Sequence, residues 1–398
     1  MSCCPRGQQR AGQASSAAGA ERALAWFEGM IGRCLDYATE AKERGRPIVG
    51  ILCEYTPREL IMAAGGVPVC LCGGSAETIS AAERELPSNL CPLIKSTYGY
   101  HVLGANPFLE MADLVVGETT CDGKKKMLEL LAQRVATHVV ELPQKPDDAD
   151  ARVHWGRELV KLRQALSDRF GVAISDGGLR EAIRAMNRER GLRRSLAALM
   201  RCDSPPLTGR ELLSLKSTIS CLPDDLAHYE SALASLPRRE GSDQSHRVRV
   251  LLTGVPVVHG AERVVELIED RGGLIVCQEN CTGLKPILDD VDESAEDPME
   301  ALTDKYFGLH CSVMTPNRRR FDALRQLAAD YRPDCVIELI WQACLTYSVE
   351  SRLVRGLVEK DLGLPYLMIE TDYSPSDSER IAVRVEALFE TVRARKRG

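Results

Sequence analysis

The sequence predicts an α/β fold in which two Rossmann-like parallel-sheet domains face one another and a helical middle domain joins them. Three observations support this prediction. Short uninterrupted apolar runs alternate with helical stretches, which is typical of parallel strands covered by helices on both faces. This alternation occurs once in each half of the chain. Between the two occurrences, residues 151–236 carry helical periodicity and no strand signal.

The chain has 398 residues, of which 44% are hydrophobic and 27% are charged, so it is long enough for two or three domains with sizeable cores. Residues 1–20 are rich in Gly, Ser, Gln and Ala and lack the apolar middle region of a secretory signal. We expect them to form a disordered tail. No apolar window reaches the roughly 18 residues that a membrane span needs. We therefore expect a cytoplasmic protein with no membrane partner.

The N-terminal α/β domain is predicted over residues 21–150. It starts with a helix over residues 21–44, in which Leu24, Ile31 and Leu35 recur at helical spacing. Four apolar runs then predict buried strands. These runs are IVGIL (48–52), VPVCL (67–71), DLVVG (113–117) and THVVEL (137–142).

The helical domain is predicted over residues 151–236, and a polar, turn-rich linker follows over 237–246. A second α/β domain is predicted over residues 247–398. Because ligands of open parallel sheets bind beyond the carboxyl ends of the strands, we expect a cleft where the two sheets face each other. The predicted strands of this domain are RVLLTG (249–254), GLIVC (273–277), CVIELI (335–340) and PYLMIE (365–370).

The formal net charge of -6 argues against a general nucleic-acid-binding protein, which needs a basic surface to displace counterions. Hydrolase and nicotinamide-dependent functions also lose support, because G-x-S-x-G, H-E-x-x-H and G-x-G-x-x-G patterns are missing. The segment GETTCDGKKK (117–126) looks like a phosphate-binding loop. However, its glycine spacing is wrong and no Ser or Thr follows the lysine. We therefore expect no ATP hydrolysis by this chain alone.

The chain contains 15 cysteines. In the cytoplasm thiols stay reduced, so a cysteine-rich enzyme more often binds metal or carries out redox chemistry than forms disulfides. Five cysteines follow predicted strands, at the edge where ligands bind, and two precede predicted helices, whose dipole stabilises a thiolate. The strand-end group is Cys53, Cys72, Cys121, Cys281 and Cys344, and the helix-start pair is Cys91 and Cys311.

A simpler interpretation is that many of these cysteines are small buried hydrophobic residues. We apply it to Cys34, Cys202 and Cys221, which lie in helical patterns, and to Cys70, which lies within a strand. Cys3 and Cys4 fall in the predicted tail. For the remaining thiols, soft ligands select zinc or an iron–sulfur cluster, and the lack of a C-x2-C pair argues against structural zinc. Spacing alone leaves the simpler interpretation open.

Two carboxyl groups are weak candidates for proton transfer. Glu279 precedes Cys281 in QENCTGLK, and Glu370 ends the last predicted strand in IETDYS. Their alternative role is to cap helices. Lys124, Lys125 and Lys126 either favour an anionic cluster near Cys121 or form a solvated helix face.

Seven segments carry a family resemblance: CEYTPRELIMAAGGVPV (53–69), NLCPLIKSTYG (89–99), VGETTCDGKKKM (116–127), QACLTYSVES (342–351), ENCTG (279–283), CSVMTPN (311–317) and IETDYSPSD (369–377). Through the first four, the sequence resembles the 2-hydroxyacyl-CoA dehydratase and benzoyl-CoA reductase family. Through the last three, it is similar to the double-cubane anaerobic reductases within that family. The resemblance covers nearly everything after the tail.

The resemblance implies an 8Fe-9S double-cubane cluster, which a separate ATP-hydrolysing iron–sulfur activator protein reduces, and a small-molecule substrate. We also expect a homodimer. Such a cluster needs six thiolates. Cys72 is the predicted sixth ligand, Cys53 is its rival and Cys277 is a weaker third candidate. One departure is Val313, where some relatives carry a second cysteine. The five ligands that the family pattern implies most securely are Cys91, Cys121, Cys281, Cys311 and Cys344.

Two other functions remain open. One is that of a 2-hydroxyacyl-CoA dehydratase subunit with a single 4Fe-4S cluster, for which Cys91, Cys121 and Cys344 would suffice. The other is that of an electron-carrier or cluster-storage protein with no substrate of its own. Iron content and activity with a reduced activator distinguish the three functions.

Overall fold

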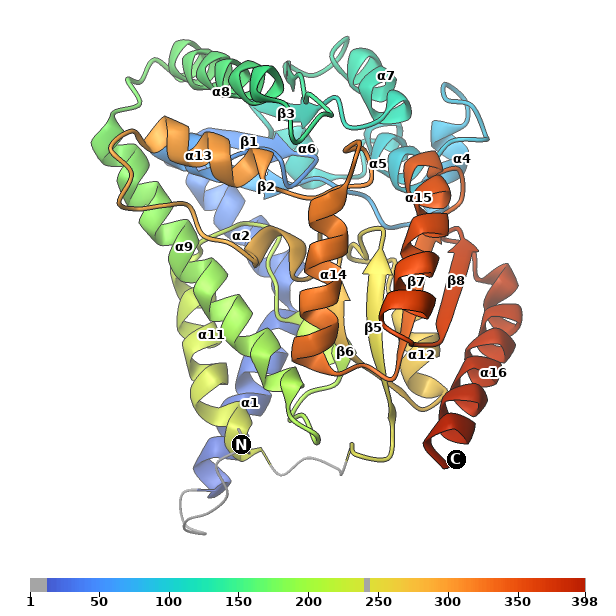
Figure 1. Ribbon diagram of the computed structural model, residues 1–398. Helices are drawn as coiled ribbons and strands as arrows, with labels where there is room; N and C mark the ends of the chain where they lie inside the picture. The colour runs from blue at the N-terminus through green and yellow to red at the C-terminus, as the bar shows by residue number, and fades with distance from the viewer. Residues whose placement is uncertain (1–12, 240–243, 398) are drawn as a thin grey trace.

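The computed structural model describes residues 13–239 and 244–397, which contain two four-stranded parallel sheets (Figure 1). The strand orders are β2-β1-β3-β4 and β6-β5-β7-β8, so both sheets have the same order. All eight predicted strands are present, and the predicted α/β class with two Rossmann-like domains is confirmed. None of the helices in the described ranges is long and apolar enough to cross a membrane.

The N-terminal half forms the first sheet and its covering helices. β1 and β3 are buried on both faces, as expected of a parallel sheet, whereas the edge strand β4 is only partly buried, with Val139 40% exposed. Its elements are α1 (Gln13–Glu28), α2 (Met30–Glu43), β1 (Ile48–Ile51), α3 (Arg58–Ala63), β2 (Val67–Cys70), η1 (Ala76–Thr78), α4 (Ile79–Ala82), α5 (Pro92–Leu103), α6 (Pro107–Met111), β3 (Leu114–Glu118), α7 (Asp122–Leu131) and β4 (Thr137–Val140).

The predicted helix over residues 21–44 is two helices that meet at Gly29, which precedes α2. The apolar spacing in the sequence runs on without a break because both helices bury an apolar face. However, α1 packs on α11, whereas α2 packs on α6 and β1. Leu24 of α1 packs in a core that the middle helices share with the second sheet, whereas Leu35 of α2 packs toward the first sheet. Moreover, α1 begins at Gln13, inside the predicted tail, and Ala20 is fully buried. Residues 1–12, with Cys3 and Cys4, lie outside the described residues.

The middle of the chain is helical, as predicted. Asp148 and Ser175 accept hydrogen bonds from the first turns of the two long helices, and Thr208 forms a capping box with Glu211. These side chains fix where each helix begins. The elements are α8 (Ala149–Phe170), α9 (Asp176–Ala198), η2 (Leu199–Arg201), α10 (Gly209–Ser214), α11 (Pro223–Ser235) and η3 (Leu236–Arg238).

The C-terminal half forms the second sheet, and the arrowheads of β5 and β8 point toward the first sheet (Figure 1). Its elements are β5 (Val248–Gly254), α12 (Arg263–Asp270), β6 (Gly273–Glu279), η4 (Lys285–Ile287), α13 (Pro298–Phe307), α14 (Arg318–Tyr331), β7 (Cys335–Trp341), α15 (Leu345–Gly356), the π-helical turn η5 (Leu357–Asp361), β8 (Tyr366–Thr371), η6 (Pro375–Asp377) and α16 (Ser378–Arg397).

The carboxyl ends of the two sheets meet directly. Tyr55, just beyond β1, donates a hydrogen bond to the carbonyl oxygen of Leu309 at 2.8 Å. Tyr373, just beyond β8, donates to the carbonyl oxygen of Gly73 at 3.3 Å. In each sheet the first strand in sequence, β1 or β5, has the second strand on one side and the third on the other. Open α/β sheets bind ligands at such a point. The fold therefore brings both binding edges into one region.

Gly74 allows this close approach. A Cβ atom at Gly74 would lie 2.1 Å from the carbonyl oxygen of His259 in the other half. We expect Gly74→Ala to lower the free energy of unfolding by about 1–3 kcal/mol, because backbone must move to relieve the overlap. Urea denaturation measures this loss. In the control Gly32→Ala, within α2, the added methyl group meets no atom within 4 Å, so equal losses in both variants would contradict the explanation.

Candidate functional site

Three of the predicted thiols lie at the N-termini of helices. Cys91, Cys121 and Cys344 are the N-cap residues of α5, α7 and α15. The thiols of Cys91 and Cys344 form a hydrogen bond with each other, which lowers the pKa of Cys91 and raises that of Cys344. Burial raises the pKa of Cys121, and negative charge on Cys344 raises it further. The three helix dipoles favour thiolates at this point.

A second group joins the two sheets. Burial raises the pKa of Cys281 to about 12, and the neighbouring charge of Cys311 contributes to the increase. Burial also raises the pKa of Cys53, at the end of β1, and so do the charges of Cys281 and Cys311 in the other half. Cys311 in turn interacts with Cys121 of the first group. The predicted thiols of both sheets therefore lie within electrostatic range of one another.

Cys70 and Cys72 form a pair at the end of β2. Their thiols share a hydrogen bond, which lowers the pKa of Cys70 to about 7 and raises that of Cys72. The charge of Cys72 interacts with Cys53, and Tyr373 lies near both Cys72 and Cys91. The interpretation of Cys70 as a core residue was therefore incomplete. The missed signal is the C-x-C spacing, which places both side chains on one face of an extended chain.

Corresponding positions in the two halves carry thiols. Cys72 lies two residues after the end of β2, and Cys281 lies two residues after the end of β6. Cys121 and Cys344 each lie three residues after the ends of β3 and β7. The position that corresponds to Cys53 is occupied by Pro256, two residues after β5.

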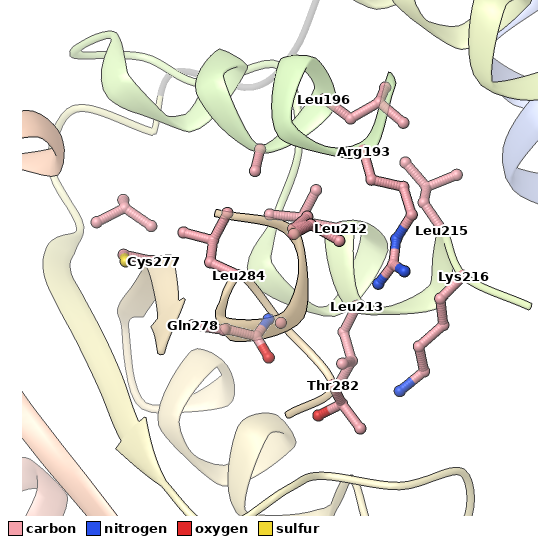
Figure 2. A pocket seen from close by; sticks show the side chains of 14 residues that line it. Arg193, Leu196, Leu212, Leu213, Leu215, Lys216, Cys277, Gln278, Thr282 and Leu284 are labelled. Carbon is pink, nitrogen blue, oxygen red and sulfur yellow. The ribbon is translucent and has the colours of Figure 1, made fainter. Parts of the chain in front are cut away.

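Cys277 lies apart from these thiols, which does not support it as a candidate ligand. It is buried inside β6, in an apolar core that includes Val276 and Tyr331. Figure 2 shows it beside Leu284, at the apolar end of a cavity of about 30 Å³. The other cysteines interpreted as structural also pack elsewhere. Cys34 bonds to Ser217, Cys221 contacts Met186, and Cys202 donates to the carbonyl oxygen of Leu199.

Two buried lysines face the thiols. Lys124 lies 2.8 Å from Glu118, and the charges of Cys53 and Glu118 raise its pKa although burial opposes ionisation. Lys285 donates a hydrogen bond to Tyr347 at 2.8 Å, and its charge interacts with Cys281. Lys124 is therefore not part of a solvated helix face. The solvated face consists of Lys125 and Lys126, which are exposed and pair with Asp122 and Glu129.

Glu279 belongs to a buried ionic network and is poorly suited to donate a proton. Its carboxylate lies 2.8 Å from His310 and 3.4 Å from Arg320, and Thr253 donates to it. Burial favours the neutral acid, but Lys285, Arg320 and His310 together lower the pKa of Glu279. The other candidate, Glu370, is exposed on β8. Glu279 is therefore held as a carboxylate although its charge acts on Cys281, and Glu370 lies on the surface.

The gathered donors are mainly thiols, which are soft metal ligands. Within the described ranges, no three His, Cys, Asp or Glu side chains are close enough together to hold one metal ion. Thiolates of an iron–sulfur cluster bind different irons, so their sulfur atoms lie farther apart than ligands of one zinc ion. The gathered groups are thiols with buried cations beside them, which matches the soft-ligand preference and the negative charge of such clusters.

Comparison with known proteins places the chain among dehydratase and reductase subunits. Residues 53–392 match the family model described as 2-hydroxyglutaryl-CoA dehydratase, D-component. The chain is 42% identical to the protein named as dehydratase subunit YjiM in Escherichia coli (strain K12), over 88% of this chain and 93% of that protein. It is 21% identical to the (R)-phenyllactyl-CoA dehydratase beta subunit of Clostridium sporogenes, with the same coverage. It is also 24% identical to a benzoyl-CoA reductase subunit of Thauera aromatica, over 72% of this chain and 76% of that protein.

Proposed function

Because the chain belongs to the 2-hydroxyglutaryl-CoA dehydratase D-component family, we propose that it is an iron–sulfur reductase. It receives low-potential electrons from an ATP-hydrolysing activator protein and delivers them to a small-molecule substrate. The observation that carries the proposal is that thiols from the two sheets lie close together. Charge on Cys281 or Cys311, in one half, raises the pKa of Cys53 in the other. Core-filling cysteines would not converge on one edge.

The residues that would hold the cofactor are Cys72, Cys91, Cys121, Cys281, Cys311 and Cys344. When bound, an 8Fe-9S double cubane supplies electrons at a potential that ordinary reductants do not reach. We prefer Cys72 to Cys53 as the sixth ligand because it corresponds in position to Cys281, and because Tyr373 lies near both Cys72 and Cys91. The contact of Cys53 with Cys281 and Cys311 keeps Cys53 as the alternative.

The protein itself supplies charge compensation and dryness. Lys124 and Lys285 are 8% and 3% exposed, so their positive charges act through little water. Val313 and Met314, beside Cys311, are also buried and exclude solvent. Val313, at the position where some relatives carry a second cysteine, thus contributes an apolar side chain. Each lysine also lies beside a buried carboxylate, Glu118 or Glu279, so the two lysines would offset part of the negative charge of a reduced cluster.

The environment of Lys124 supports the proposal that a partner protein, and not this chain, hydrolyses ATP. In a phosphate-binding loop the lysine reaches the nucleotide phosphates. Here its amine is bound to Glu118 and faces buried thiols, and the loop pattern is incomplete. Members of this family work with an activator component. The chain is therefore proposed to receive electrons after ATP has been hydrolysed elsewhere.

A second candidate function is that of a 2-hydroxyacyl-CoA dehydratase subunit with one 4Fe-4S cluster. It is favoured by the dehydratase relatives and by the arrangement of Cys91, Cys121 and Cys344, which meet at three helix N-termini without help from the other thiols. The reaction would remove water from a 2-hydroxyacyl-CoA after transfer of one electron to the substrate.

Anaerobic purification followed by quantification of iron and acid-labile sulfide tests both candidates. We expect about eight irons per chain for the double cubane, whereas about four would favour the dehydratase subunit. Cys281→Ser should lose part of the iron in the first case and almost none in the second. The same assay on Cys72→Ser and Cys53→Ser identifies the sixth ligand. Zinc alone, without iron, would contradict both functions.

A further inference from the structure

Helix α15 has an exposed apolar face. Leu345, Val349 and Leu353 are 73%, 75% and 61% exposed and recur every four residues, so they lie in one row. Leu345 and Val349 are the two most exposed large hydrophobic side chains in the described ranges. The opposite face of the helix, which includes Tyr347 and Val354, is buried. Single exposed apolar residues are common, but a contiguous row marks an interaction surface.

This row starts beside the candidate site. Leu345 directly follows Cys344, whose thiol contacts Cys91. An exposed residue also adjoins a second helix-capping thiol, since Asp122 follows Cys121 and has a side-chain exposure of 97%. Figure 1 shows the start of α15 directed toward the first sheet. Cys121 and Cys344 are thus near solvent at this end of the molecule, where an electron donor could approach them.

We propose that the exposed face of α15, formed by Leu345, Val349, Arg352 and Leu353, is the docking surface for the electron-donating activator protein. This inference rests on the proposed function. Its first support is size. A stable dimer buries roughly 800 Å² on each partner, more than one row of three side chains offers, whereas transient redox complexes use smaller interfaces. The expected homodimer would therefore use another surface.

Charge provides the second support. Arg352 lies on the same face and is exposed, and it has no ion pair with any of the residues that the structure describes. Pairing of two identical copies across this face would bring their Arg352 side chains together, which is unfavourable. A donor that presents a thiolate-ligated iron–sulfur cluster is negatively charged around that cluster. Arg352 would attract such a partner although the net charge of this chain is -6.

Val349→Glu tests the docking surface. The probe is the activator purified from the same organism, with its cluster reduced and a non-hydrolysable ATP analogue bound, and affinity is measured by biolayer interferometry. We expect binding to weaken by about tenfold or more, because a charge replaces an apolar contact. Arg352→Glu should slow association and reduce its salt dependence. Leu345 is left unchanged because it adjoins Cys344.

The matched control is Val383→Glu, which places the same charge at a valine that is 62% exposed on α16. It should bind the activator as the unsubstituted chain does. Iron and sulfide content of Val349→Glu should stay unchanged, which separates docking from cluster assembly. Unchanged affinity of Val349→Glu in a chain that carries iron would overturn the docking proposal alone, and a dimer that dissociates in this variant would show that a second copy occupies the face. Absence of iron from the unsubstituted chain would instead overturn the proposed function.

Discussion

Cys344→Ser should lose activator-dependent substrate reduction to the background of the assay and should lose iron on purification. Serine keeps the size of the side chain but replaces a soft thiolate with a hard oxygen that stays protonated at neutral pH. Cys344 contacts Cys91 at the N-termini of two helices, so its loss also removes the partner that lowers the pKa of Cys91. Iron and sulfide quantification, with activity measured in parallel, gives the result.

The control for this substitution is Cys202→Ser. The thiol of Cys202 donates to the carbonyl oxygens of Leu199 and Ser204, and a serine hydroxyl can make the same bonds. The variant should keep the iron and the activity of the unsubstituted chain. Full iron content in Cys344→Ser would remove Cys344 from the ligand set in the double-cubane and the single-cubane case alike.

Arg320→Met should lower the free energy of unfolding by about 3–5 kcal/mol, because it removes one member of a buried ionic network and leaves carboxylates without a counter-charge. Arg320 is fully buried on α14. It lies 2.9 Å from Glu338 and 3.4 Å from Glu279, and it also pairs with Glu350. Chemical denaturation measures the loss.

The pH dependence of this loss follows from the carboxylates. Lys285, Arg320 and His310 lower the pKa of Glu279 despite its burial, so its pairing stabilises the fold above the ordinary carboxyl pKa and the contribution is lost as pH falls. The deficit of Arg320→Met should therefore be largest near neutral pH and should shrink on acidification. Arg325→Met, on the same helix, removes only exposed pairs with Asp322 and Asp361 and should cost less than about 1 kcal/mol. Equal losses in the two variants would contradict the buried-network explanation.

The strands could be predicted from the sequence because each contains a short run of mostly apolar residues, although β4, β5 and β7 include polar side chains such as His138, Arg249 and Glu338. The gathering of Cys121, Cys281 and Cys344 at one edge could also be predicted, since parallel strands place their carboxyl ends together. The break at Gly29 could not, because one apolar stripe serves two different surfaces. Only the packed structure separates those surfaces.

The charged groups around the thiols were harder to predict. In sequence Lys124 is one of three consecutive lysines, and only the fold shows that it turns inward to Glu118 while Lys125 and Lys126 stay in solvent. Glu279 was a candidate proton donor because it precedes Cys281. Its partners His310 and Arg320 come from segments that are distant in sequence, so their effect on its pKa depends on tertiary structure.

The identical strand orders of the two sheets have a consequence for the history of the site. Two halves with one topology, and thiols at Cys72 and Cys281 and at Cys121 and Cys344 in equivalent positions, are what duplication and fusion of a single ancestral gene would produce. The ancestor would have assembled the site across a twofold axis between two copies. The two halves now differ, because α15 has an exposed apolar row whereas α7 has a charged surface. In a symmetric ancestor an electron donor could have docked equally well on either half. The difference between α15 and α7 would restrict docking to one half.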